Sequence, residues 1–387
     1  MKKTYSIILV IFLCLLVIMI ARDFNQQPSK KAMVYPFPAE FNKQQAVWLQ
    51  WPSEIYNTDR PVYPVILNII KSLDPYIRIN LMVRSQEETN QIKDLLKNSG
   101  YTVNNVHYYV VNHMSIWTRD VGPIFVKSPQ NKLQVVDFGF NNYSRSGNPD
   151  YIAAESQVDR LAAKLLNLPV IKTDLISEGG AIESNGRGTM MVTESVALSR
   201  NPKMSKAEIE KEYKRVLGVK KVIWLKKGLA EDDPITTGHI DEIARFANPN
   251  TILLAQVLPG DRYTNAITQE SYRRMEENYE ILRNATDQDG KPFHIIRIPM
   301  PPTIYGKVDE TGKIPVLSYL NYAVTNGAVL MQTYWQSGRS EMLKTTENQV
   351  KDTLQKVFPG RRIIGINVEN VNRWGGGIHC ITQHMPE

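Results

Sequence analysis

The chain has 387 residues, a formal net charge of +7 at neutral pH and an ordinary globular composition, with 42% hydrophobic and 22% charged residues. This composition excludes a low-complexity or largely disordered protein, and the length predicts one large domain or two smaller ones. The positive charge is diffuse, without an arginine-rich helix or a basic tract interleaved with aromatic residues, so nucleic-acid binding is not indicated.

The N-terminal segment differs from the rest of the chain. Lys2 and Lys3 precede an uncharged apolar run over residues 7–21, a pattern typical of a secretory signal. The run lacks small residues at its end and is long enough for a tilted span, which favours an uncleaved signal-anchor over a cleaved signal peptide. We expect this anchor or signal over residues 1–24, a polar linker over 25–35 and a folded domain over 36–387. That domain would work outside the cytoplasm, either periplasmic and held at the inner membrane by residues 7–21 or secreted.

Amphipathic stretches in the folded domain predict five helices, at residues 85–98, 153–167, 205–217, 268–286 and 342–358. Each is followed by a short run with strand character, at 106–111, 170–175, 221–225, 293–300 and 362–368. A hairpin is expected over 181–193, where Asn-Gly-Arg-Gly supplies the turn.

The repetition of these modules predicts the fold class. Five strand–helix–strand units, too widely spaced for a simple solenoid, indicate an α/β ring of similar units. A doubly wound α/β sheet is the alternative. It is disfavoured because no glycine-rich phosphate loop follows a strand and because many strands are expected to be joined by hairpins.

Cys380 is the most informative residue for function. Only one other cysteine, Cys14, exists, and it lies in the N-terminal apolar run, so Cys380 is a lone thiol in the folded domain. It ends the run Trp-Gly-Gly-Gly-Ile-His-Cys at 374–380, in which three glycines allow close approach of a ligand to the main chain. A catalytic thiol and a buried core cysteine both fit this run taken alone.

Four other segments combine reactive groups with small residues: Trp-Thr-Arg-Asp-Val-Gly-Pro at 117–123, Glu-Gly-Gly at 178–180, Gly-His-Ile-Asp at 238–241 and Ser-Tyr-Leu-Asn-Tyr at 318–322. If residues 238–246 form a strand, His239 and Asp241 project from one face and can address the same bound group. A zinc site at His239, Asp241 and Cys380 is disfavoured because no ligand-pair spacing supports it. A buried structural histidine is the alternative for His239.

Together these motifs resemble agmatine deiminase and the wider family that includes the Porphyromonas-type peptidylarginine deiminases. Further matches are Pro-Ala-Glu at 38–40, Trp-Leu-Gln-Trp-Pro at 48–52, Phe-Pro-Gly-Arg-Arg at 358–362 and Ile-His-Cys-Ile-Thr-Gln at 378–383. The resemblance runs in order from about residue 36 to the end, so the deiminase catalytic domain would span residues 36–387. It implies a pentein fold, a five-bladed α/β propeller of ββαβ-like modules with the active site at the centre.

The resemblance also implies the roles of five catalytic residues. Asp120 and Asp241 would bind the flat guanidinium cation, whose N–H groups match a carboxylate in its plane. Cys380 would attack its central carbon as a thiolate, favoured by the bound cation, to give a covalent thiouronium intermediate. His239 would donate a proton to the leaving ammonia and then take one from water, and Glu178 would lie beside it. No metal and no organic cofactor is needed for this chemistry.

Four residues are predicted to contact the rest of the substrate. Trp117 would form an apolar wall, Asn321 a hydrogen bond, Gly377 a position of close approach, and Arg145 a contact to a terminal carboxylate. His379 is left as structural, because neighbouring strand residues point to opposite faces. A salt bridge between Asp120 and the adjacent arginine would be the structural alternative to a role in binding.

Two departures from the resemblance leave the substrate open. Agmatine deiminases carry an extra residue between the glycines and Ile-His-Cys, and the loop after residue 137 lacks their tryptophan and glycine pattern. The motifs favour agmatine, converted to N-carbamoylputrescine in putrescine biosynthesis. The N-terminal segment and altered loop favour peptidyl or free arginine, converted to citrulline. Two other functions are compatible with the sequence: an amidinotransferase and an inactive propeller that binds cations. The sequence also allows a homo-oligomer.

Overall fold

The computed structural model describes residues 37–302 and 315–387, and five small sheets dominate its architecture. Four sheets have three strands each: β4 (Ile124–Lys127), β5 (Leu133–Asp137) and β6 (Val170–Lys172); β7 (Ile182–Ser184), β8 (Thr189–Thr193) and β9 (Lys221–Leu225); β10 (Ala244–Asn248), β11 (Thr251–Gln256) and β12 (His294–Pro299); β13 (Ala323–Val324), β14 (Ala328–Thr333) and β15 (Arg362–Asn367). The remaining sheet has four, in the order β16 (Gln383–Pro386), β1 (Gln44–Gln50), β2 (Arg78–Val83) and β3 (Val106–Val110).

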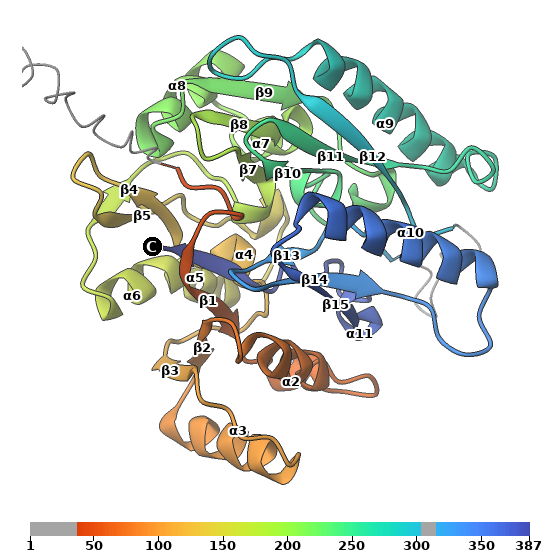
Figure 1. The fold of residues 1–387 in the computed structure, drawn as a ribbon. Coiled ribbons are helices and arrows are strands. Elements are labelled where there is room, and N and C mark those ends of the chain that lie inside the picture. Colours follow the sequence, from red (N-terminus) through yellow and green to blue (C-terminus); the bar gives the residue numbers. More distant parts are fainter. Residues whose placement is uncertain (1–36, 303–314) are drawn as a thin grey trace, which may run out of the picture. The chain divides into compact units, whose positions relative to one another are not determined.

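Every sheet repeats one topology. Its first two strands pair antiparallel, its second and third pair parallel, and helices connect the parallel pair. These crossover helices are α2 (Tyr63–Leu73), α5 (Pro149–Glu155) with α6 (Val158–Leu165), α7 (Glu194–Arg200) with α8 (Lys206–Leu217), α9 (Ala266–Asn284) and α10 (Glu341–Val357). The five sheets surround the short helix α4 (Thr118–Val121), with α8, α9, α10 and α2 on the outside (Figure 1). The predicted α/β fold of five ββαβ modules is therefore confirmed.

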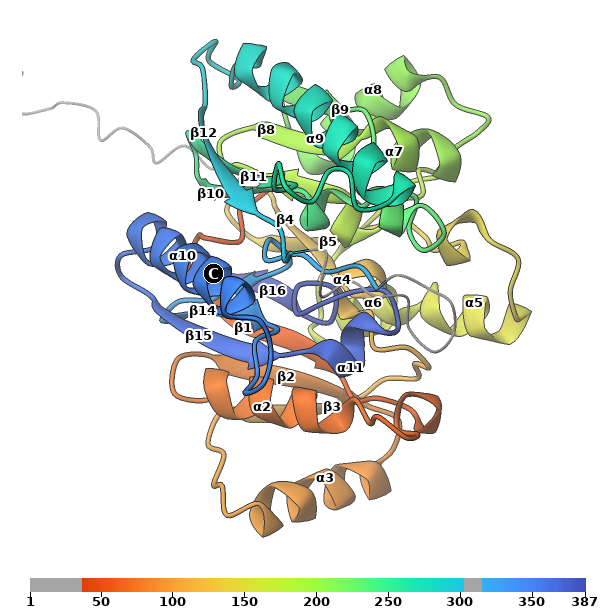
Figure 2. The same ribbon diagram turned by 90° about the vertical axis from the view of Figure 1, so that its right-hand side faces the viewer.

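The first module is completed by the C-terminal strand. β16 pairs antiparallel with β1, with Trp48 opposite Gln383, and the two strands lie side by side in Figure 2. This pairing brings residues 378–382, which directly precede β16, next to the start of the folded domain.

Local sequence explains why the predicted helices form. In α8, Ser205 and Glu208 make a reciprocal capping box, Gly218 ends the helix with φ 64°, and Ile209 and Tyr213 lie on the buried face. The hairpin predicted over 181–193 is confirmed as β7 and β8. Helix α2 was missed because its sequence, YPVILNIIKSL, is short and mostly apolar and reads as a buried strand as easily as a helix.

That omission also changes how the first module was counted. The predicted helix at 85–98 is α3 (Gln86–Asn98), which links β2 to the extra strand β3. The crossover helix equivalent to those of the other modules is α2. Thus five modules were counted, but one was counted on the wrong helix.

The predicted signal-anchor and linker at residues 1–35 lie outside the described residues. In the ranges 37–302 and 315–387, no helix has both the length and the apolar character that crossing a membrane requires.

Candidate active site

Five loop segments hold the polar groups singled out from the sequence, and each directly precedes the first strand of one module. They are α4 before β4, η3 (Gly179–Ala181) before β7, η5 (Ile240–Glu242) before β10, residues 318–321 before β13, and residues 378–380 before β16. Hydrogen bonds join neighbouring segments: Arg119 N donates to Cys380 O at 3.0 Å, and Gly180 N donates to the Asp120 Oδ1 atom at 3.1 Å. The repeated topology therefore gathers residues from widely separated parts of the chain.

The strand predicted over residues 238–246 is wrong in its first half. His239 precedes the single 3-10 turn η5, Asp241 lies within it, and strand β10 begins only at Ala244. His239 N donates to the buried Asp232 carboxylate at 2.9 Å, which holds this turn in place. The His239 and Asp241 side chains converge through this turn rather than through the alternation of a strand.

Gly180 lies at the point where three of these groups meet. A β-carbon added there would stand 2.7 Å from His239 Nδ1, 2.8 Å from Asp120 Oδ1 and 3.1 Å from Asp241 Oδ2. Only glycine fits this position without displacing a neighbour. The structure thus brings Asp120, His239 and Asp241 together around one backbone position.

Cys380 lies in a turn beside two carboxyl groups. Its Sγ atom is 3.6 Å from Asp241 Oδ2 and 3.9 Å from Glu242 Oε1, and the Asn321 side-chain amide donates to it at 3.1 Å. Burial raises the pKa of the Cys380 thiol well above its usual value, and the charges of Asp241 and Glu242 raise it further. The sulfur is therefore a protonated thiol while no cation is bound.

His239 lies between two acidic groups. Its Nε2 atom is 3.5 Å from Glu178 Oε2, and its Nδ1 atom is 3.8 Å from Asp120 Oδ1. Burial alone would lower the pKa of His239, but Asp120 and Glu178 outweigh it and raise the pKa to about 9. His239 is therefore an imidazolium near neutral pH.

The two acidic neighbours of His239 differ in charge state. Burial works to raise the pKa of Glu178, but Arg200, whose Nε atom is 2.6 Å from the carboxylate, and His239 lower it to about 2. Burial and the neighbouring acids raise the pKa of Asp120 to about 6, although Tyr143 donates a hydrogen bond to it at 2.9 Å. Both acids are ionised at neutral pH.

Several of these buried groups lack hydrogen-bond partners. Among the described residues they include both ring nitrogens of His239, Asp241 Oδ1, Glu178 Oε2 and Glu242 Oε2. An unpaired buried polar atom costs about 1–3 kcal/mol, so a cluster of them marks a place where a ligand supplies the missing partners. The excess of acidic groups indicates a cationic ligand.

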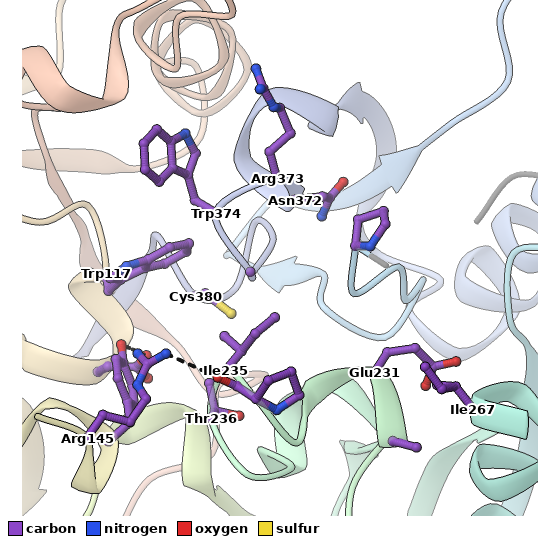
Figure 3. Close-up of a pocket in the computed structure, with 16 residues that line it drawn as sticks. Trp117, Arg145, Glu231, Ile235, Thr236, Ile267, Asn372, Arg373, Trp374 and Cys380 are labelled. Atoms are coloured by element: carbon purple, nitrogen blue, oxygen red, sulfur yellow. Dashed lines mark hydrogen bonds between the residues drawn. The ribbon is translucent and has the colours of Figure 1, made fainter. Parts of the chain in front are cut away.

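A cavity of about 430 Å³ reaches Asp120 and Cys380, whereas His239, Asp241 and Glu178 lie behind them and do not line it. Asp120 and Cys380 line it, and Figure 3 shows the Cys380 sulfur between Trp117 and Ile235. Its remaining wall is mainly apolar, but Arg145 also lines it, with Nη1 donating to the Pro234 carbonyl at 3.2 Å.

The structure separates the four predicted substrate contacts into two pairs. Trp117 and Arg145 line the cavity. Asn321 does not, since its amide nitrogen donates to Cys380 Sγ and Glu242 and its oxygen accepts from the backbone N–H groups of 379 and 380. Gly377 does not either, because a β-carbon there would meet the Gln332 side chain at 2.5 Å.

Gly376, rather than Gly377, is the glycine that faces the Cys380 sulfur. Its β-carbon would lie 2.7 Å from the Trp117 ring and 3.0 Å from Cys380 Sγ. Gly377 instead stabilises the anionic form of the sulfur through its backbone. Gly376 thus takes the place that the sequence had assigned to Gly377, and close approach of a ligand to this run stays a prediction.

His379 does not lie in a strand, so the reason for leaving it as structural was wrong. It belongs to the turn over 378–381, and its ring contacts the carboxylates of Glu40 and Asp241. The salt bridge suggested between Asp120 and Arg119 is also absent among the described contacts, because Arg119 pairs with Glu40 at 3.1 Å instead.

Sequence reasoning missed Glu242, Tyr143 and Arg200. Glu242 follows Asp241 directly, and a second acid beside the Gly-His-Ile-Asp motif was the signal that could have found it. Tyr143 and Arg200 come from separate segments without any local motif, and only their contacts with Asp120 and Glu178 identify them.

One group of described residues could offer ligands to a metal ion. Asp241, Glu242 and Cys380 place potential ligand atoms within 4.8 Å of one another. Three such donors fall short of a closed tetrahedral site. The same three groups also suit a cation that carries N–H donors.

Comparison with known proteins identifies the family. The model of the Porphyromonas-type peptidyl-arginine deiminases matches residues 36–386. A Latilactobacillus sakei protein with the provisional name agmatine deiminase is 30% identical over 93% of this chain and 98% of its own, and the agmatine deiminase of Medicago truncatula is 28% identical over 91% and 96%. The solved agmatine deiminase of Enterococcus faecalis superposes with a TM-score of 0.77 at 26% identity, over 92% of this chain and 96% of its own. This chain therefore belongs to the Porphyromonas-type peptidyl-arginine deiminase family.

Proposed function

We propose that this protein hydrolyses agmatine to N-carbamoylputrescine and ammonia, with Cys380 as the nucleophile. Family membership and the named relatives make it a hydrolase of carbon–nitrogen bonds in linear amidines. The observation that carries the proposal is the cluster of unpartnered, buried polar atoms around Cys380, His239 and Asp241. A guanidinium group has the charge and the N–H donors to satisfy the oxygens of that cluster.

Binding of the cation prepares the nucleophile. The guanidinium lies between the carboxylates of Asp120 and Asp241 and above the sulfur of Cys380. Its positive charge offsets the acidic neighbours that raise the pKa of the thiol, so the thiol proton leaves to solvent as the substrate binds. The substrate thus generates the thiolate that attacks it, and no reactive thiolate is kept in its absence.

Two proton transfers by His239 complete the reaction. Attack of Sγ on the central carbon gives a neutral tetrahedral adduct, and the His239 imidazolium then protonates one amino group so that ammonia leaves. The product of this step is a cationic thiouronium, and His239 is now neutral. It takes a proton from water, hydroxide adds to the carbon, and the thiolate is expelled as the ureido product forms. The surplus proton leaves with ammonia as ammonium.

A direct assay tests this proposal. The full-length protein is incubated with agmatine, free arginine and a peptide that ends in arginine, and ureido product and ammonia are measured for each. We expect turnover of agmatine, and a loss of about 10³-fold or more in the Cys380→Ala variant with an unchanged circular dichroism spectrum. Ammonia release by that variant at the parental rate would exclude the cysteine mechanism.

A second candidate substrate is an arginine with a free carboxylate. Arg145 lines the cavity, and this cation suits a carboxylate better than the ammonium group of agmatine. If agmatine is the substrate, Arg145→Ala leaves kcat/KM within about threefold, because a cation at the cavity wall gives agmatine no favourable contact. A loss of about tenfold or more on the peptide, with faster turnover of peptide than agmatine in the parent, would favour the second candidate.

We also propose that residues 7–21 anchor the protein with its catalytic domain outside the cytoplasm, on the sequence pattern alone. Membrane fractionation and protease treatment of intact cells test this location. Recovery of the full-length protein in the soluble cytoplasmic fraction would contradict it.

A further inference from the structure

His379 makes two contacts that the proposed reaction does not use. Its Nδ1 atom is 2.7 Å from Asp241 Oδ2, and its Nε2 atom is 2.7 Å from Glu40 Oε2. The three side chains are buried, with exposed fractions of 1% for His379, 0% for Asp241 and 6% for Glu40. The imidazole therefore bridges two carboxyl groups in the absence of bulk water.

The His379 ring is held at both of its nitrogens. Each nitrogen lies 2.7 Å from a carboxyl oxygen, one of Asp241 and one of Glu40. Burial is outweighed at Glu40 by His379, Arg245 and Arg119, which hold its pKa well below the usual value. The pKa of Asp241 is also lowered despite burial, first by its hydrogen bond from His379. The imidazole therefore links two carboxyl groups through short hydrogen bonds.

The bridge holds Asp241 by the oxygen that faces Cys380 and Gly180. Oδ2 accepts from His379 and lies beside the Cys380 sulfur, while Oδ1 is buried and has no hydrogen-bond partner. Glu40 is held in turn by Arg119 and Arg245, at 3.1 and 2.9 Å. Asp241 is therefore connected through His379 to a rigid buried ion network, which prevents its carboxylate from rotating.

We propose that His379 is a positioning residue: held between Glu40 and Asp241, it fixes the Asp241 carboxylate beside the Cys380 sulfur, in the orientation that meets the bound cation. This inference rests on the proposed function for its substrate, but it concerns any amidinium or guanidinium group at the site. It assigns a role to the histidine of the Ile-His-Cys run that is separate from that of the neighbouring thiol.

Two variants separate the two contacts of the ring. The amide nitrogen of asparagine falls near the position of Nδ1 and can donate to Asp241, whereas that of glutamine falls near Nε2 and can donate only to Glu40. We expect kcat/KM for agmatine to fall by less than about tenfold in His379→Asn and by about 10²-fold in His379→Gln, mainly through KM. Equal losses in both variants, or a larger loss in His379→Asn, would overturn the proposal.

Alkylation of Cys380 gives a readout that does not depend on turnover. Chloroacetamidine carries the cationic amidinium group and iodoacetamide is neutral, so the ratio of their alkylation rates reports recognition of the cation beside the sulfur. We expect this ratio to fall by about tenfold or more in His379→Gln and to stay within about threefold in His379→Asn. A purely structural role would change both rates in parallel and leave the ratio at the parental value, which would refute positioning. If the parent shows this selectivity but turns over no guanidine substrate, the proposed function fails while the positioning role stands.

A measurement without a His379 variant covers the case in which both variants fail to fold. In nitrogen-15 spectra of histidine-labelled protein with the His379 ring assigned, we expect both ring nitrogens of His379 to be hydrogen-bonded. A His379 ring nitrogen without a hydrogen bond would contradict the bridge between two carboxyl groups.

Discussion

Gly180→Ala is the substitution for which the structure predicts the most specific effect. The new β-carbon would stand 2.7 Å from His239 Nδ1 and 2.8 Å from Asp120 Oδ1. Because non-bonded atoms pack at about 3.5 Å, these two groups would have to move by roughly 0.7–0.8 Å. A misplacement of about 1 Å in a catalytic group costs about 10²-fold in rate, whereas overpacking of this kind destabilises the fold by only about 1–3 kcal/mol.

The test compares activity with stability. We expect kcat/KM for agmatine to fall by about 10²-fold, while urea unfolding shows a loss of no more than about 3 kcal/mol. Gly260→Ala is the matched control, because a β-carbon at that exposed turn meets no atom within 4 Å. Parental kcat/KM in Gly180→Ala would refute the arrangement of the site described above.

Three further predictions concern charge. Arg200→Met leaves the fully buried Glu178 carboxylate without its ion pair and should lower the free energy of unfolding in urea by about 3–5 kcal/mol. Arg283→Met, at an exposed pair on α9, is the control and should lower it by less than about 1 kcal/mol. Similar losses of unfolding free energy in the two variants would contradict the buried pair. Burial, together with a neighbouring carboxylate, raises the pKa of Asp159 to about 8. The folded state therefore binds this proton more tightly than the unfolded state, so the contribution of Asp159 to stability falls as pH rises from about 4 to 8. The melting temperature of Asp159→Asn should rise increasingly above that of the parent over this range. A difference in melting temperature that does not change with pH would contradict the shift. Asp120→Asn removes one carboxylate from the proposed cation site and should lower kcat/KM for agmatine by about 10- to 100-fold. If the inhibition constant for guanidinium chloride is the same in this variant as in the parent, Asp120 does not bind the cation.

Local patterns were sufficient for most of the fold. The helices α8, α9 and α10 each have an apolar stripe on one face and a capping residue at the start, so their period and their ends can be read from consecutive residues. Helix α2 is mostly apolar and has no capping side chain at its start, and β16 is short and pairs with a strand more than 300 residues earlier in the chain. Neither could be assigned from local sequence, because each is stabilised by contacts distant along the chain.

The candidate site divides in the same way. Cys380, His239 and Asp241 stand out because rare residue types occur beside glycines, which is visible in the sequence. The shift of the His239 pKa to about 9, and the bridge that His379 makes, depend on acidic groups from other modules. Burial of those groups sets the strength of each interaction, and burial exists only in the folded chain.

What the sequence by itself determined is therefore the chemistry: a lone thiol, a histidine, acidic residues suited to a flat cation, and five repeated modules to carry them. Only the tertiary structure decided which side chain holds Asp241 in place, which glycine faces the sulfur, and which side chains carry charge. The physical reason is that residue types and local periods are properties of consecutive positions. Hydrogen-bond partners and pKa values are instead set by neighbours that folding brings together and by the water that it removes.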